Sequence, residues 1–79
     1  MTGIKNYTIS LKYKGKWQIY HRVGDNLRGW SYKHYADSKG ITVEQYCIDV
    51  AKQLKHSLWW ATGARVTSEG KVIYQEEDT

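Results

Sequence analysis

The sequence predicts a small α+β protein in which a single-layer antiparallel sheet packs on one amphipathic helix, in the order β-β-β-α-β-β. Residues 6–23 alternate apolar and polar side chains with the period of a strand, and residues 64–75 do so again. Between them, residues 42–58 carry an apolar stripe with the period of a helix. A chain of 79 residues is long enough for one two-layer domain, here residues 1–79, but too short to cover both faces of a sheet.

The first hairpin is expected over residues 6–23, with its turn at Gly15. A two-residue loop at Lys14 and Gly15 would mix apolar and polar side chains on each face. A three-residue loop over residues 13–15 instead pairs Leu11 with Trp17 and Ile9 with Ile19, so we predict this register. The outer face of the hairpin would then carry Thr8, Ser10, Lys12, Gln18, Tyr20 and Arg22.

A third strand is expected at "WSYKHY", residues 30–35, after the turn-forming stretch "GDNLRG". Its alternation places Trp30 and Tyr32 in the core, together with Trp17 from the first hairpin. Lys33 and Tyr35 would join the basic outer face of the sheet.

The helix is predicted to begin at Thr42, which has capping-box spacing to Gln45. Its apolar stripe consists of Val43, Tyr46, Cys47, Val50, Ala51, Leu54 and Leu58. Glu44 near the start and Lys55 and His56 near the end suit the helix dipole. The end of the helix is open: if it continues through Ala61, Gly63 falls at the left-handed position that follows a helix. A second hairpin would follow over residues 64–75, with a three-residue loop at residues 68–70.

No catalytic or metal-binding motif is present, so we expect a non-enzyme with no cofactor and no metal. The three histidines and Cys47 have no metal-ligand spacing, and Cys47 lies in the middle of the helix stripe as core. "GDNLRG" resembles a phosphate-binding loop only in its glycines, because it lacks the Lys-Ser/Thr that must follow. No apolar run is long enough to span a membrane. The single cysteine favours a reducing compartment, so we expect the cytoplasm, that of the host if the chain is phage-encoded.

Charge is concentrated in the first half of the chain. Residues 1–40 hold eight Lys and Arg against two Asp, whereas residues 41–79 hold four against six acidic residues. A basic half suggests an anionic partner, and nucleic acid is one candidate. The residues expected to contact nucleic acid or an acidic partner are Lys12, Lys14, Lys16, Tyr20, Arg22, Arg28, Lys33 and Tyr35.

On these residues the first half of the chain resembles a known DNA-binding architecture. Over about residues 5–57 the β-β-β-α order, a tryptophan after the first hairpin and basic strand residues are similar to the three-stranded domains at the N-terminus of tyrosine integrases and in AP2-type factors. The resemblance implies binding by a sheet face that enters the major groove.

The aromatic content favours a second hypothesis, that of a protein-binding surface. The chain has four Trp and seven Tyr but no Phe, and Trp59 and Trp60 are adjacent, so both cannot face one core. We assign Trp59 to the margin of the core and Trp60, with His56 and Ile48, to a partner-binding surface. Small size and surface aromatics are typical of phage or mobile-element inhibitors of the anti-CRISPR or anti-restriction type. Such an inhibitor would dock on a host protein or nucleoprotein complex, as a monomer or a homodimer.

Overall fold

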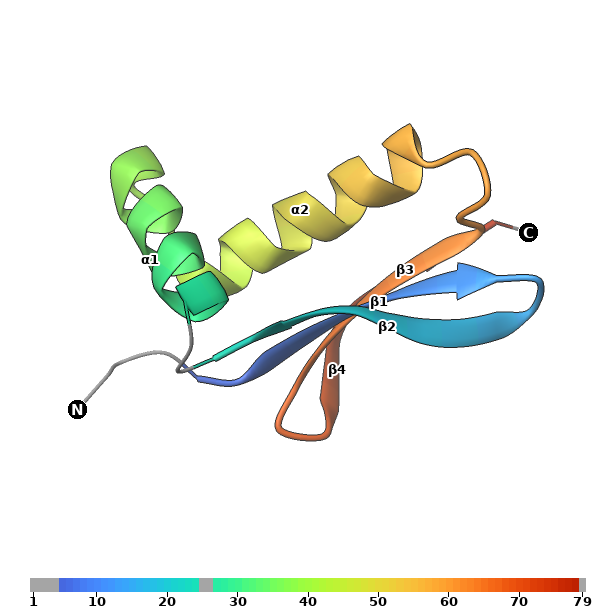
Figure 1. The fold of residues 1–79 in the computed structure, drawn as a ribbon, viewed down its shortest axis with the longest axis horizontal. Coiled ribbons are helices and arrows are strands. Elements are labelled where there is room, and N and C mark those ends of the chain that lie inside the picture. The colour runs from blue at the N-terminus through green and yellow to red at the C-terminus, as the bar shows by residue number, and fades with distance from the viewer. Residues whose placement is uncertain (1–4, 25–26, 79) are drawn as a thin grey trace.

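The computed structural model describes residues 5–24 and 27–78 and contains a four-stranded antiparallel sheet with two helices. The elements are β1 (Tyr7–Tyr13), β2 (Lys16–Val23), α1 (Leu27–Lys39), α2 (Val43–Ser57), β3 (Gly63–Ser68) and β4 (Lys71–Glu77). The strands lie in the order β2-β1-β3-β4, and both helices lie on one side of the sheet (Figure 1). The predicted α+β class is confirmed, but the order is β-β-α-α-β-β because the predicted third strand is helix α1.

Both hairpins turn through two residues, so the predicted three-residue loops are wrong. Tyr13 pairs with Lys16 across Lys14-Gly15, and Ser68 pairs with Lys71 across Glu69-Gly70. Both residues of each turn have positive φ, between 50° and 84°. This backbone twist matches the right-handed twist of the flanking strands and favours two-residue hairpin turns.

A β-bulge in each hairpin restores the apolar pairing away from the turn. In the first hairpin Ser10 pairs with Ile19 and Ile9 with His21, which leaves Tyr20 as the extra residue. The second hairpin has the same irregularity between Val66 and Thr67. Near the turn, therefore, Gln18 lies opposite Leu11 on the helix side of the sheet, and Ile19 lies on the outer face, where it is 55% exposed.

Among the α1 residues whose burial the structure describes, two of the three buried ones are small. Gly29, Tyr32 and Ala36 are buried, at the spacing of neighbouring turns of a helix. Lys33 forms an ion pair with Asp37 one turn later, with 3.0 Å between Nζ and Oδ2, and Gly40, with φ of 71°, follows the last residue. Tyr32 belongs to the core as predicted, whereas Trp30 does not: it is 66% exposed on the opposite side of the helix.

Helix α2 follows the prediction closely at its start. The side chain of Thr42 accepts a hydrogen bond from the backbone N–H of Gln45 at 3.0 Å, and Lys55 and His56 lie in the last turn. The end that the sequence left open is Ser57: the helix does not continue through Ala61, and Gly63 is the first residue of β3 with no positive φ. Within the described ranges no helix is both long and apolar enough to cross a membrane.

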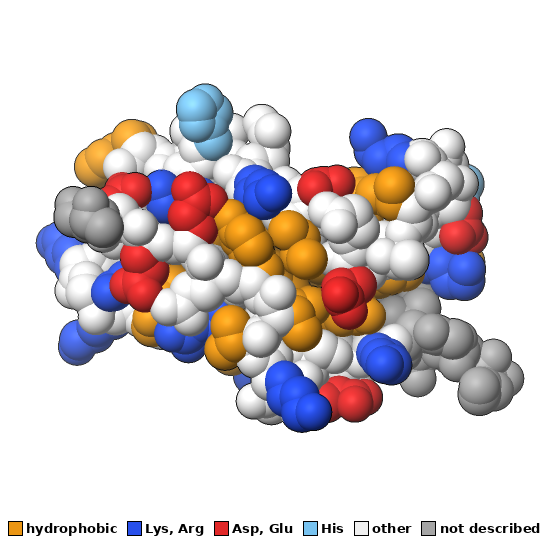
Figure 2. Space-filling model, turned by 180° about the vertical axis from the view of Figure 1, so that it is seen from behind, with side chains coloured by type: hydrophobic (Ala, Val, Ile, Leu, Met, Phe, Trp, Pro, Cys, Tyr) orange, Lys and Arg blue, Asp and Glu red, His pale blue; other side chains and the backbone are white. Residues whose placement is uncertain are grey.

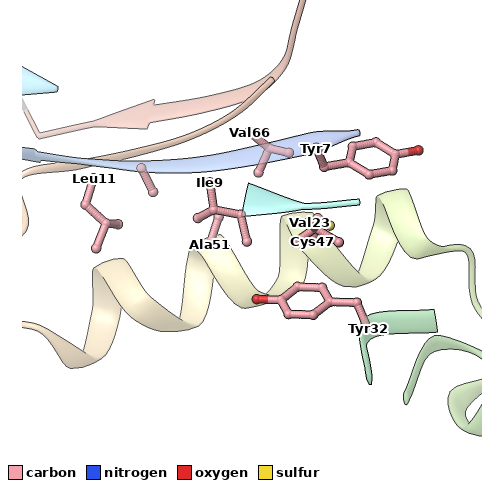
Figure 3. Close-up of a cluster of buried hydrophobic side chains, with 9 residues drawn as sticks. Tyr7, Ile9, Leu11, Val23, Tyr32, Cys47, Ala51 and Val66 are labelled. Carbon is pink, nitrogen blue, oxygen red and sulfur yellow. The ribbon is translucent and has the colours of Figure 1, made fainter. Parts of the chain in front are cut away.

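The hydrophobic core lies between α2 and the two central strands (Figure 3). Ile9 and Leu11 of β1 and Val66 of β3 meet Cys47 and Ala51 of α2, and none of the five is more than 1% exposed. Burial raises the pKa of the Cys47 thiol to about 12, with a smaller contribution from the charge of Glu44. These buried side chains identify the face of the sheet that points toward α2.

Candidate functional site

A pocket of about 320 Å³ lies where the β1–β2 turn meets the connection from α2 to β3. Four residues line it, and we call it the turn-end pocket: Tyr13, Gln18, Trp59 and Trp60. Both connections lie at the opposite end of the molecule from α1 (Figure 1). Trp59 is 91% exposed, the largest exposure among the large hydrophobic side chains that the structure describes.

Backbone hydrogen bonds attach the α2–β3 connection to the end of β1. The N–H of Ala61 donates to the carbonyl of Leu58 at 3.0 Å, which closes a turn around Trp59 and Trp60. The N–H of Thr62 then donates to the carbonyl of Lys12 at 2.9 Å. This second bond fixes the two tryptophans beside the hairpin.

The predicted exposures of the two tryptophans are reversed. Trp60 was expected on the surface, but it is half-buried, packs against the core, and meets the ring of Tyr13 edge-on with 5.5 Å between centroids. Trp59, expected at the core margin, points into solvent. The reason is that residues 59 and 60 form a turn, in which neither helical nor strand periodicity sets side-chain direction.

The two-residue turn places the hairpin side of the pocket. Residues opposite each other in an antiparallel pair share a face, and the face alternates along each strand. Leu11 points toward α2, so its partner Gln18 lies on that same face (Figure 3). The pair two positions closer to the turn, Tyr13 and Lys16, also lies on this face. In the predicted register Gln18 would lie on the opposite face, away from the tryptophans.

Two lysines border this end of the sheet. The Nζ atom of Lys14 lies 5.3 Å from the centroid of the Tyr13 ring, and Lys16 is exposed and pairs with Tyr13. Ion pairs within the described residues involve Lys12, Lys33 and Lys55, not these two. Two lysines without an ion-pair partner among the described residues therefore lie at the hairpin end that carries the aromatic pocket.

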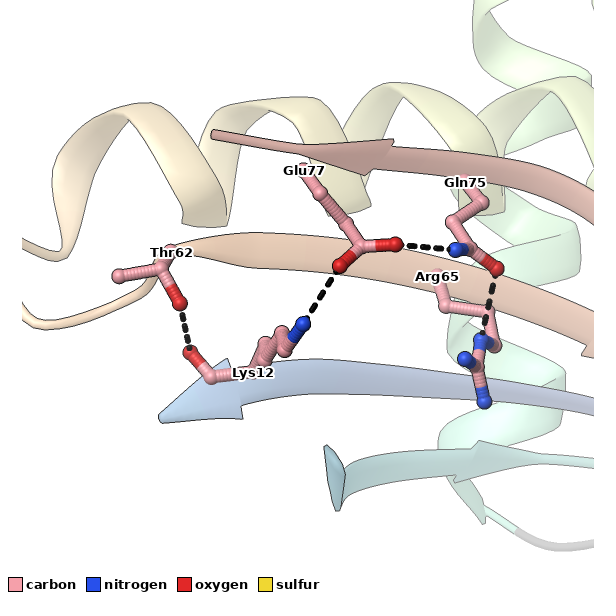
Figure 4. Close-up of polar contacts among 5 residues, drawn as sticks. All are labelled: Lys12, Thr62, Arg65, Gln75 and Glu77. Carbon is pink, nitrogen blue, oxygen red and sulfur yellow. Dashed lines mark hydrogen bonds and ion pairs between the residues drawn. The ribbon is translucent and has the colours of Figure 1, made fainter. Parts of the chain in front are cut away.

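The outer sheet face, predicted to be a basic surface, is occupied by an internal network (Figure 4). Lys12 donates to Glu77 at 2.6 Å, Gln75 donates to Glu77 at 2.5 Å, and Arg65 donates to Gln75 at 3.1 Å. These contacts lower the pKa of the Glu77 carboxyl, the Lys12 hydrogen bond most. Lys12 is thus neutralised and is not available as a free cation.

Trp17 lies across this outer face, so the prediction that placed it in the core is wrong. The guanidinium carbon of Arg65 is 4.0 Å from the centroid of the Trp17 ring, and Lys12 is 5.7 Å from it. A Cβ atom added to Gly63 would come within 3.0 Å of the Trp17 ring. Glycine at this position therefore lets the ring lie over β3.

The other residues predicted for nucleic acid or an acidic partner do not form one surface. Arg22 lies on the outer face opposite Thr8, and Tyr20 is the exposed bulge residue. Lys33 and Tyr35 lie on helix α1, not on a sheet strand. The side chain of Arg28 lies outside the described part of the chain.

Helix α1 carries a second aromatic surface. Trp30 stacks on His34 with 5.5 Å between centroids and 9° between planes, and His34 meets Tyr35 edge-on at 5.6 Å. Tyr35 in turn stacks on Tyr46 of α2 at 6.1 Å. We call these four residues the α1 aromatic row. The sequence did not predict it, because residues 30–35 were expected to form a strand with Trp30 in the core.

His56 and Ile48, predicted to join Trp60 in a partner surface, lie elsewhere. His56 lines a groove of about 380 Å³ between α2 and β4, with Lys55 and Glu76. In this groove Lys55 is held 2.5 Å from Asp78, and this hydrogen bond raises the pKa of Lys55. Ile48 is half-buried and packs against the core, so it offers no free patch. Seen from behind, acidic and basic side chains are interleaved around an apolar centre (Figure 2).

Comparisons with known proteins leave the geometry as the guide to function. No family model, curated protein or solved structure matches the chain. The three-stranded order behind the resemblance to integrase and AP2-type domains is absent, because its third strand is helix α1. Within the residues described, no three His, Cys, Asp or Glu side chains gather as a metal site would require.

The turn-end pocket has the chemistry of a binding site. Its two indoles and one phenol offer flat apolar surfaces, and the amide of Gln18 can both donate and accept hydrogen bonds. Sequence reasoning missed Tyr13, Gln18 and Trp59 as site residues. The repeated x-Gly turn in both hairpins, Lys14-Gly15 and Glu69-Gly70, was the signal that would have placed the first two.

Proposed function

We propose that this chain is a non-catalytic binding protein that docks on a macromolecular partner through the turn-end pocket, with Trp59 as the anchor. The observation that carries the proposal is the 91% exposure of Trp59 beside a pocket walled by Tyr13 and Trp60. An indole in water forgoes roughly 1.5–3 kcal/mol of burial, which binding a partner would recover. Tryptophan is also among the side chains that most often dominate binding energy.

The contacts that hold the pocket walls in place also support a binding role. Trp60 is fixed against Tyr13, and the connection is tied to β1 by the Thr62 hydrogen bond, so the walls are in place before a partner arrives. A pre-organised site loses less conformational entropy when it binds. Two further parts of the proposal rest on the sequence alone: that the protein works in the cytoplasm, and that its docking inhibits a host protein or nucleoprotein complex. Self-association is a further prediction, which light scattering would test.

Site-specific photo-crosslinking in living cells tests the proposal. A benzophenone amino acid replaces Trp59 in one variant, Gln18 in a second and the exposed Ser38, at the far end of α1, in a control. We expect the first two variants to crosslink to the same discrete macromolecule and the control not to do so, because Trp59 and Gln18 line one pocket. Identical products from all three positions, or none from position 59, would contradict the proposal.

A further inference from the structure

The chemistry of the turn-end pocket narrows the class of ligand that it suits. A pocket of about 320 Å³ is at the lower end of the range for ligand sites, about 300–1,000 Å³, and has room for one flat ring system rather than a folded segment. Three of its four lining residues are aromatic. A planar, polarisable ring stacked on these walls would fill it.

The charge beside the pocket points to an anionic ligand. Lys14 is placed at the Tyr13 wall, 5.3 Å from the ring centroid. Lys16 lies on the same sheet face as Tyr13 and Gln18 by register. Glu76, Glu77 and Asp78, the acidic residues at the end of the chain, are engaged with Lys12 and Lys55. Lys14 and Lys16, which have no ion-pair partner among the described residues, therefore lie beside an aromatic slot, Lys14 within the β1–β2 turn and Lys16 directly after it.

We propose that the turn-end pocket binds single-stranded nucleic acid. One unstacked base lies between Trp59 and the Tyr13–Trp60 pair, its edge is reached by the Gln18 amide, and the flanking phosphates contact Lys14 and Lys16. This inference rests on the proposed function, because it names the ligand of the same pocket. Aromatic platforms next to basic side chains are the usual means of holding single strands.

Single strands suit this site better than a duplex or an acidic peptide. In a duplex each base is stacked on its neighbours, so its face is not free to lie against an indole. An acidic peptide would satisfy the lysines but leave the flat walls without a ring unless it also supplied an aromatic side chain. A nucleotide carries both the ring and the charge in one unit.

A fluorescence titration of the purified protein tests the inference. Short single-stranded oligothymidylate carrying a dye is titrated with protein, and anisotropy and tryptophan quenching are recorded at several salt concentrations. We expect saturable binding. The logarithm of the association constant should fall linearly with the logarithm of the salt concentration, with a slope of about −1.4 for two phosphate contacts on a single strand. A duplex of matched length should bind more weakly, and equal binding would contradict the single-strand assignment.

Matched variants locate the binding. Trp59→Ala should weaken it by about 5- to 150-fold, since stacking on one aromatic side chain is worth roughly 1–3 kcal/mol. Lys14→Ala with Lys16→Ala should bring the salt slope close to zero. Trp30→Ala, on the exposed α1 aromatic row, and Lys39→Ala are the controls and should leave both quantities unchanged. Circular dichroism should show all variants folded, because each changed side chain is exposed.

The outcomes separate this inference from the proposed function. Absence of oligonucleotide binding, or equal losses in Trp59→Ala and Trp30→Ala, would overturn the ligand assignment. If position 59 still crosslinked to a protein in cells, docking through the pocket would stand and its partner would be a protein. If position 59 gave no crosslink in cells and Trp59→Ala did not weaken oligonucleotide binding, both proposals would fail.

Discussion

Replacing Ile9 with alanine is expected to lower the free energy of unfolding by about 2–5 kcal/mol, the range for deleting a buried aliphatic side chain. Ile9 has no exposed surface, pairs with Val66 and His21, and packs in the cluster between β1 and α2. A domain of this size has little stability to spare, so much of the variant should be unfolded at modest urea concentrations. Urea denaturation followed by circular dichroism measures the change.

Ile19→Ala is the matched control from the same hairpin. Ile19 lies on the outer face and is 55% exposed, so its loss should change stability by less than about 1 kcal/mol. The three-residue loop predicted from sequence would instead pair Ile9 with Ile19 in the core. Equal losses in the two variants would therefore favour that register and contradict the two-residue turn.

Stability should fall steeply as pH rises from about 9 to about 12. The pKa of Cys47 is raised by burial from 9.0 to about 12, and a group whose folded pKa is raised stabilises the fold below its unfolded pKa and loses that contribution as pH rises. For Cys47 this corresponds to about 4 kcal/mol. Burial and then its hydrogen bond to Glu76 raise the pKa of Tyr74 to about 12, which acts in the same direction.

Urea denaturation at a series of alkaline pH values measures this effect, and Cys47→Ala is its control. The variant should start from a lower stability because the thiol fills core space, but its stability should depend less on pH between 9 and 12 than that of the parent. The remaining dependence should come from Tyr74, from Tyr7 with its raised pKa, and from Lys55. Identical pH profiles for the two proteins would show that Cys47 does not titrate with a raised pKa.

Helix α2 and both hairpins are predictable from the sequence because their signals are local. Thr42 caps the helix within one turn, and the apolar stripe falls on the face that meets the sheet. The hairpin registers are not predictable from side-chain matching alone. The bulge at Tyr20 lets the half near the turn and the half far from it take different registers, and the positive φ values at Lys14 and Gly15 determine which turn forms.

Helix α1 is not predicted by the apolar–polar pattern of the sequence, for a different reason. Among the α1 residues whose burial the structure describes, two of the three buried ones are Gly29 and Ala36, which give almost no hydrophobic signal, whereas the large side chains of Trp30 and Tyr35 face outward. Alternation over residues 30–35 therefore predicts a strand where the packing requires a helix. Because residues 30–35 are helical, Lys33 and Tyr35 do not lie on the sheet, and the predicted basic sheet face loses both.

The candidate site was predictable only in part. The sequence indicates that Trp59 and Trp60 must diverge, but which one is exposed depends on the Ala61–Leu58 turn and on the docking of Thr62 to Lys12. The turn follows neither the helical nor the strand period, and the Thr62–Lys12 contact joins segments far apart in the chain, so residue periodicity carries no information about either. The same contacts bring Trp60 to Tyr13 and create the pocket.

The exposure of Trp59 is the most direct test of this account. Acrylamide quenching is measured on two variants that each retain one tryptophan, Trp59 or Trp60, with the other three replaced by phenylalanine. We expect the Trp59 protein to be quenched nearly as readily as free tryptophan and the Trp60 protein much less, because Trp60 packs against Tyr13 and the core. A Trp60 that is quenched more readily than Trp59 would contradict the assignment of the anchor and of the pocket built around it.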